Sequence, residues 1–186
     1  MLRAVQTVVD EGLARPILIG RPAVIERRIE KLGLRIKAGE DFELTNIDDD
    51  PRFNSYWQRY HELMQRRGTN PDAAKAIVRS RVTVVAALML DRGEADAMIC
   101  GIVGRYQRKL QHILSVIPRD PGVQSLAALT AVANDRGTFF FLDTHVQADP
   151  TAEQIAEATL QAAFRLKLFG IVPKIALLSH SNFGSH

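Results

Sequence analysis

The chain has 186 residues, of which 46% are hydrophobic and 24% are charged, and its formal net charge is +3. This balance is typical of a globular protein, and no apolar run reaches the roughly 18 residues that a membrane-spanning helix needs. Asp10 and Glu11 interrupt the first apolar residues, so the sequence predicts no signal peptide. The single cysteine, Cys100, excludes an internal disulfide framework, and no Cys/His group has the spacing of a zinc site. We therefore expect a cytoplasmic protein with no metal site, no membrane partner and, because no basic block is interleaved with aromatic residues, no nucleic-acid partner.

Hydrophobic periodicity predicts helices alternating with short strands. Apolar runs bounded by Gly or Pro are typical of strands buried on both faces of a parallel sheet, whereas residues 134–137 have the composition of a hairpin turn between antiparallel strands. We expect an α/β protein with a mixed, mostly parallel sheet. The predicted elements are helix 2–13, strand 16–20, helix 24–33, strand 42–46, a helix through 53–64, a helix from 70, helix 82–90, strand 97–101, a helix through 110–117, strands 126–132 and 138–142, a helix from 150 and strand 174–178.

Three acidic residues, Asp48, Asp49 and Asp50, precede Pro51 and the helix through 53–64. Carboxylates favour the N-terminal end of a helix, where they accept hydrogen bonds from free backbone N–H groups. The interpretation is therefore a helix cap in a solvated loop, with a divalent-cation site as the alternative.

Polar or glycine-containing loops follow three predicted strands, at residues 101–106, 143–145 and 179–185. Parallel α/β sheets place ligand sites at the carboxyl ends of their strands, so we expect these loops to converge on one cleft. Gly101 and Gly104 would allow backbone N–H groups to approach an anion, and the following helix would add a favourable dipole. A plain tight turn is the alternative.

Three further features have both a functional and a structural interpretation, and Cys100 has a structural one. Asp143 and His145 lie two residues apart on one face of an extended segment, so they are either an acid–base or metal pair or the cap of a turn. Residues 179–185 carry three hydroxyls, an amide and an imidazole, which suit a phosphate or pantetheine group but are also common in turns. Arg79 and Arg81 either reach a phosphate or pair with surface carboxylates, and Cys100 is expected to be a small core residue.

Three tracts in order, residues 93–101, 143–154 and 176–185, resemble phosphate acetyltransferases. The most specific are Pro-Thr-Ala-Glu-Gln at 150–154 and Ser-x-Ser-x-x-Gly-Ser at 179–185. Residues 104–106, Gly-Arg-Tyr, together with 179–185, resemble more closely the phosphotransacetylase-like C-terminal region of large bacterial NADP-dependent malic enzymes. That region is a branch of the phosphate acetyl/butyryltransferase family.

The resemblance implies a three-layer α/β/α fold like that of isocitrate and isopropylmalate dehydrogenases. It implies a first domain at 1–148 and a second at 149–186 that is truncated at the C-terminus. It also implies a malic enzyme catalytic region in the same polypeptide, with NADP and Mg or Mn, and a homo-oligomer. The implied ligand is acetyl-CoA or a related acyl-CoA, bound at its anionic or adenine end by Gly101, Gly104, Arg105 and Tyr106 and at its acyl end by Ser179, Ser181 and Asn182.

The chain departs from active acetyltransferases in both of these loops, and in the first loop such enzymes have a different, Ser/Thr-containing sequence. Such enzymes typically carry Thr-Lys where this chain has Asn182 and Phe183, and the missing lysine would remove a charge that helps to hold acetyl phosphate. The resemblance therefore implies a region without catalytic residues of its own, which senses acetyl-CoA and supports oligomerisation. The alternatives are an active phosphate acetyltransferase and a purely structural dimerisation module that uses helices 82–90 and 110–117.

Overall fold

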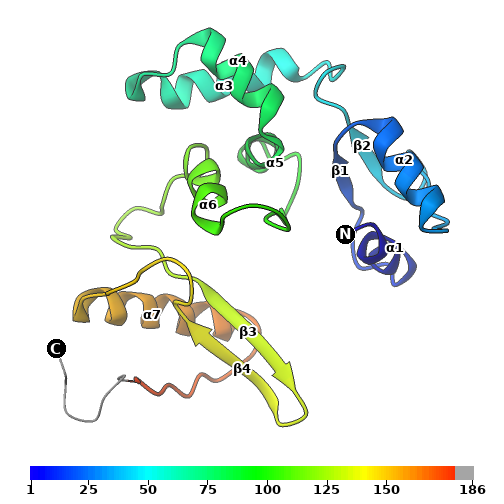
Figure 1. Ribbon diagram of the computed structural model, residues 1–186. Coiled ribbons are helices and arrows are strands. Elements are labelled where there is room, and N and C mark those ends of the chain that lie inside the picture. Colours follow the sequence, from blue (N-terminus) through cyan, green and yellow to red (C-terminus); the bar gives the residue numbers. More distant parts are fainter. Residues whose placement is uncertain (179–186) are drawn as a thin grey trace. The chain divides into compact units, whose positions relative to one another are not determined.

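A computed structural model of the chain describes residues 1–178, which form helices and two small sheets (Figure 1). The predicted α/β class is confirmed. Contacts divide the chain into two compact units, one from Met1 to Pro118 and the other beginning at Arg119. The domain boundary predicted between residues 148 and 149 stays a prediction.

The first unit begins with a small parallel sheet covered by two helices. Strand β1 (Ile17–Ile19) pairs with β2 (Glu43–Thr45) in the register Ile17 to Glu43, as expected from their apolar runs. Helices α1 (Leu2–Asp10) and α2 (Pro22–Lys31) carry apolar faces. These faces join the sheet in a core cluster whose buried members are Val5, Ile29, Ile36 and Phe42.

The larger part of the first unit is helical and is built around one buried helix, α5 (Val82–Asp91). A helix that is apolar on all sides must be covered on all sides, and Val84, Val85, Ala87 and Leu88 are fully buried. The neighbouring helices are α3 (Phe53–Met64), α4 (Pro71–Ser80) and α6 (Tyr106–Leu114), with a short 3₁₀ helix, Gln65–Arg67, after α3. The helix predicted from residue 70 is confirmed, and the side chain of Asn70 caps it by accepting a 2.8 Å hydrogen bond from Ala73 N.

The second unit contains a hairpin and one long helix. Strands β3 (Leu129–Asn134) and β4 (Gly137–Leu142) are antiparallel, which confirms the predicted hairpin. Helix α7 (Ala152–Leu168) starts with a capping box, in which Thr151 and Gln154 each satisfy the other's backbone N–H. The expected mixed sheet is therefore seen as two separate pairs of strands, one parallel and one antiparallel.

Two predicted strands, 97–101 and 174–178, are wrong. Both segments are irregular, and Ile99 and Leu178 are 90% and 89% exposed. An apolar run becomes a buried strand only where neighbouring strands satisfy its backbone N–H and C=O groups, and within residues 1–178 no strand pairs with either segment. For the same reason Cys100 is exposed, which corrects its prediction as a core residue.

We expect Leu88→Ala to lower the free energy of unfolding by about 2–5 kcal/mol, because it opens a cavity in a fully packed core. The matched control is Leu13→Ala, the same substitution at a side chain that is 67% exposed, which should cost less than about 1 kcal/mol. Urea unfolding followed by circular dichroism measures both. Equal losses for the two variants would contradict the central position of α5.

Candidate ligand-binding sites

The predicted glycine turn lies directly before α6. Gly101 and Gly104 both have φ of 101°, a conformation that glycine adopts without strain. Arg105 is the N-cap residue of α6, and its side chain makes no capping hydrogen bond. The turn is exposed on its surface, with Val103 80% and Tyr106 46% accessible. Gly101, Gly104, Arg105 and Tyr106 are thus brought together beside a helix N-terminus, as an anion-binding turn requires.

A charged cluster stands at the carboxyl end of β2, where acidic residues were predicted to cap a helix. The carboxylate of Asp50 instead accepts hydrogen bonds from Arg52, at 2.8 Å from the backbone N, 2.9 Å from Nε and 2.8 Å from Nη2. These bonds from the guanidinium, together with its charge, hold the pKa of Asp50 below its usual value. The cap prediction is therefore confirmed only in part: Asp50 accepts from the backbone N–H of Arg52 at the start of α3, but Arg52 is the N-cap residue and its guanidinium takes up the rest of the carboxylate.

The same cluster fixes the chain just after α5. Glu94 accepts hydrogen bonds from Arg52 Nη1 at 3.0 Å and from the hydroxyl of Tyr56, and it forms an ion pair with Arg92 Nε at 2.6 Å. Burial, followed by the hydrogen bond to Glu94, raises the pKa of Tyr56 above its usual value, so the phenol stays a proton donor. We name Asp50, Arg52, Tyr56, Arg92 and Glu94 the arginine–carboxylate cluster. It anchors the start of the segment that leads to the glycine turn.

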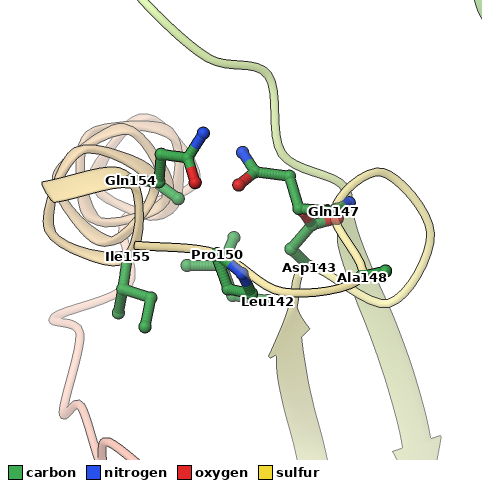
Figure 2. A pocket seen from close by; sticks show the side chains of 8 residues that line it. Leu142, Asp143, Gln147, Ala148, Pro150, Gln154 and Ile155 are labelled. Atoms are coloured by element: carbon green, nitrogen blue, oxygen red, sulfur yellow. Dashed lines mark hydrogen bonds between the residues drawn. The ribbon is translucent and has the colours of Figure 1, made fainter. Parts of the chain in front are cut away.

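In the second unit, Asp143 organises the turn that follows β4 (Figure 2). Its carboxylate accepts hydrogen bonds from the backbone N of Val146 at 2.9 Å, Gln147 at 3.0 Å, Ala128 at 3.2 Å and His145 at 3.4 Å. Burial by itself would raise the pKa of Asp143, but these four N–H donors outweigh it and lower the pKa. A carboxylate so fully occupied supports the turn-capping interpretation over an acid–base pair with His145.

A hollow of about 220 Å³ lies between this turn and the first turns of α7 (Figure 2). Gln147 Nε2 donates to the carbonyl of Leu126 at 3.2 Å. Because a carbonyl can only accept, this bond fixes the orientation of the amide. Gln147 Oε1 is then buried, and it has no hydrogen-bond partner within residues 1–178. The hollow is lined by Leu142, Asp143, Gln147, Ala148, Pro150, Gln154, Ile155 and Ala158.

The hollow combines one unmatched acceptor with apolar walls, which suits a small apolar group that carries an N–H or O–H donor. Sequence reasoning missed Gln147. Only its position in the turn after Asp143 could have suggested it.

The remaining predicted site residues, Ser179, Ser181 and Asn182, lie outside the described residues, so the convergence of the loops stays a prediction. Among residues 1–178, no group of three or more His, Cys, Asp or Glu side chains could hold a metal ion. In that same part of the chain, no helix has the length and apolar character needed to cross a membrane.

These features describe an α/β protein with candidate anion and small-ligand sites beside helix N-termini. Comparison with known proteins gives the family: the family model described as "Phosphate acetyl/butaryl transferase" matches residues 1–186. The chain belongs to this family.

Two curated relatives differ clearly in their similarity to the chain. The NADP-dependent malic enzyme of Escherichia coli is 51% identical over 185 residues, which cover 100% of this chain and 24% of the relative. The phosphate acetyltransferase of Nitratidesulfovibrio vulgaris is 28% identical over 185 residues, covering 100% and 26%. The chain thus spans about a quarter of the length of these curated relatives.

The solved structures agree with the family assignment. A phosphotransacetylase from Streptococcus pyogenes superposes with a TM-score of 0.83 at 26% identity, over 100% of this chain and 55% of that one. The similarity supports the α/β class found here.

We expect Asp143→Asn to lower the free energy of unfolding by about 1–3 kcal/mol at pH 7, because charge-assisted hydrogen bonds from four N–H groups are weakened. The pKa of Asp143 is lower in the folded protein than in the unfolded chain. Its contribution is therefore complete above about pH 4 and is lost as the pH falls through the folded-state pKa. Urea unfolding at pH 7 and pH 3 should show the difference between wild type and variant shrinking at the lower pH.

The control for this experiment is Asp149→Asn, the same chemical change at an exposed carboxylate of the same segment. It should alter the free energy of unfolding by less than about 0.5 kcal/mol. If Asp143→Asn lowers the free energy of unfolding by the same amount at pH 7 and pH 3, the result contradicts the role of the ionised, hydrogen-bonded carboxylate.

Proposed function

We propose that the chain is the phosphotransacetylase-like region of an NADP-dependent malic enzyme and that it binds acetyl-CoA to regulate the attached enzyme. One observation carries the proposal: identity over the whole chain is 51% to a malic enzyme and 28% to a phosphate acetyltransferase. The oxidative decarboxylation of malate to pyruvate, with NADP and Mg or Mn, would belong to a separate region of the same polypeptide. We also expect the parent protein to be a cytoplasmic homo-oligomer.

The glycine turn supports the ligand assignment. A phosphate-bearing ligand needs N–H donors and positive charge, and Gly101, Gly104 and Arg105 offer both next to the first turn of α6. The exposed ring of Tyr106 could stack on an adenine. Ser179, Ser181 and Asn182 are proposed for the acyl end, on the sequence resemblance alone.

Regulation requires that acetyl-CoA has different affinities for two states of the enzyme. A coupling free energy of about 1–3 kcal/mol corresponds to a change in affinity of roughly 5–150-fold. By reciprocity, the substrate of the attached enzyme would change the affinity for acetyl-CoA by the same factor.

The second candidate function is a working phosphate acetyltransferase, supported by the family itself. The thiolate of CoA would attack the acyl carbon of acetyl phosphate, the bond from that carbon to the phosphate oxygen would break, and phosphate would leave. Donors such as Ser179 and Ser181 would hold the charge on the acyl oxygen. The replacement of the usual Thr-Lys by Asn182 and Phe183 argues against this function.

In the complete enzyme, Arg105→Gln should weaken acetyl-CoA binding by about 5–30-fold, since it removes a charge-assisted contact worth roughly 1–2 kcal/mol. Calorimetric titration measures the affinity. The matched control is Arg136→Gln, an exposed arginine in the hairpin turn, which should bind like wild type. No heat of binding in the wild-type enzyme, with kinetics unchanged by acetyl-CoA, would refute regulation.

An assay for acetyl transfer separates the two functions. We expect no production of acetyl-CoA from acetyl phosphate and CoA by the complete enzyme. Clear turnover would favour the acetyltransferase instead. Light scattering with and without acetyl-CoA tests whether the ligand changes the oligomer.

A further inference from the structure

Three cationic residues belong to the two helix ends that meet next to the glycine turn: Arg81 is the N-cap residue of α5, and Arg108 and Lys109 lie near the start of α6. We propose that Arg81, Arg108 and Lys109 form a binding site for a phosphate group at the N-terminus of α5. We name these three residues the cationic cluster.

A direct contact joins the two helices at this point. Lys109 Nζ, on α6, donates to Thr83 Oγ1 in the first turn of α5, at 3.3 Å. Thr83 is only 3% exposed, so the ammonium is held against the end of a buried helix. Arg108 precedes Lys109 on α6, and Arg81 is the N-cap residue of α5.

The N-terminus of α5 lacks the groups that normally neutralise such an end. No side chain makes a capping hydrogen bond there, and the first turn contains no acidic residue. The first backbone N–H groups of a helix have no intrahelical acceptor and carry partial positive charge. The three cations therefore add to a charge that is already positive.

Among the described residues the cationic cluster forms no ion pair, whereas several other arginines of the unit do. Arg52, Arg59 and Arg92 each form a salt bridge with a carboxylate. Within residues 1–178, no carboxylate lies within 4.0 Å of the charged nitrogens of Arg81, Arg108 or Lys109. Arg79, by contrast, lies over the ring of Phe53 at 4.7 Å. Of the two arginines that the sequence singled out for phosphate, only Arg81 is unengaged.

His112 lies close enough to the cationic cluster for the charges of its three residues to affect the pKa of the imidazole. It follows Arg108 and Lys109 by four and three residues on α6, so it lies on the same helix face. Its Nδ1 is buried and has no hydrogen-bond partner among the described residues. Burial lowers its pKa first, and the charges of Arg81, Lys109 and Arg108 lower it further. A bound dianion would offset those charges and raise this pKa.

The geometry selects the chemical class of the ligand. Two guanidinium forks, an ammonium and a helix N-terminus are the donors that a phosphate dianion prefers. The phosphate can be free inorganic phosphate or the phosphate group of a larger ligand. The inference does not rest on the proposed function, because none of these three residues is among those proposed to bind acetyl-CoA, although the Lys109 side chain passes beside Gly104.

The test is a titration of inorganic phosphate into the 186-residue chain at pH 7 and constant ionic strength. The ring C–H signals of the five histidines are followed by NMR, with His112→Gln to assign the signal of His112. We expect a saturable shift of that signal and a rise in the pKa of His112, with sulfate competing and chloride not. No saturable shift up to about 100 mM phosphate would overturn the site.

Variants separate binding from a general effect of charge. Arg81→Gln should weaken phosphate about tenfold, as loss of one charge-assisted contact implies, and Lys109→Gln should act in the same direction. Arg66→Gln, the same change at an exposed arginine of the 3₁₀ helix, should leave the affinity unchanged. Circular dichroism checks that each variant is folded. Equal effects of Arg81→Gln and Arg66→Gln would overturn the site.

A competition experiment on the complete enzyme identifies the source of the phosphate. If inorganic phosphate displaces acetyl-CoA, and Arg81→Gln weakens both, the site holds a phosphate group of that ligand. If both bind together, the site is for free phosphate. If phosphate binds and acetyl-CoA does not, the result counts against the proposed function and not against this site. If acetyl-CoA binds and phosphate does not, the result counts against this site and not against the proposed function.

Discussion

The first unit depends on the burial of α5. Its apolar residues point in all directions, so α3, α4 and α6 must pack around it, and only its two ends can carry polar chemistry. At the C-terminal end, Arg92 and Glu94 enter the arginine–carboxylate cluster. At the N-terminal end, Arg81 is the N-cap residue and Lys109 donates to Thr83, and within the described part of the chain neither cation forms a salt bridge with a carboxylate. One helix thus separates a neutralised cluster from an unneutralised one, and this contrast is the physical basis for placing an anion at the second.

Carboxylates in this chain serve to hold the backbone. Glu94 lies among Arg52, Arg92 and Tyr56, and removing one partner of such a cluster leaves the others without compensation. Asp143 has the same role in the second unit, where four backbone N–H groups take up its acceptor capacity. The pKa values of Asp50 and Asp143 are both lowered, so both carboxylates stay ionised and hydrogen-bonded. This agrees with a structural role rather than with proton transfer.

Local signals predicted the helices well, because periodicity and caps depend on neighbouring residues. The helix starts near residues 70 and 150 were predicted, and the structure shows that Asn70 and the pair Thr151 and Gln154 cap them. The strands predicted at 97–101 and 174–178 are wrong because an apolar run shows only that a segment tends to be buried. It does not show which neighbouring strand would pair with it. Gln147 escaped notice because its unmatched oxygen results from a bond to Leu126, which is 21 residues away. Arg79 and Arg81 could not be told apart for a similar reason: the ring of Phe53 engages only one of them.

The same contrast limits how a bound ligand could affect the protein under the proposed function. A closely packed helix either moves as a rigid body or keeps its position, because the packed core around it cannot deform continuously. Between Glu94, which is anchored, and Tyr106, which begins α6, the chain is irregular and contains two glycines with positive φ. A change of conformation costs least there. An anion bound by Arg105 acts at the end of this segment, whereas one bound by Arg81 and Lys109 would tighten the contact between α5 and α6. Ligand binding at the two places would therefore have different mechanical consequences: one would act on an irregular turn, and the other would strengthen a helix contact that is already formed.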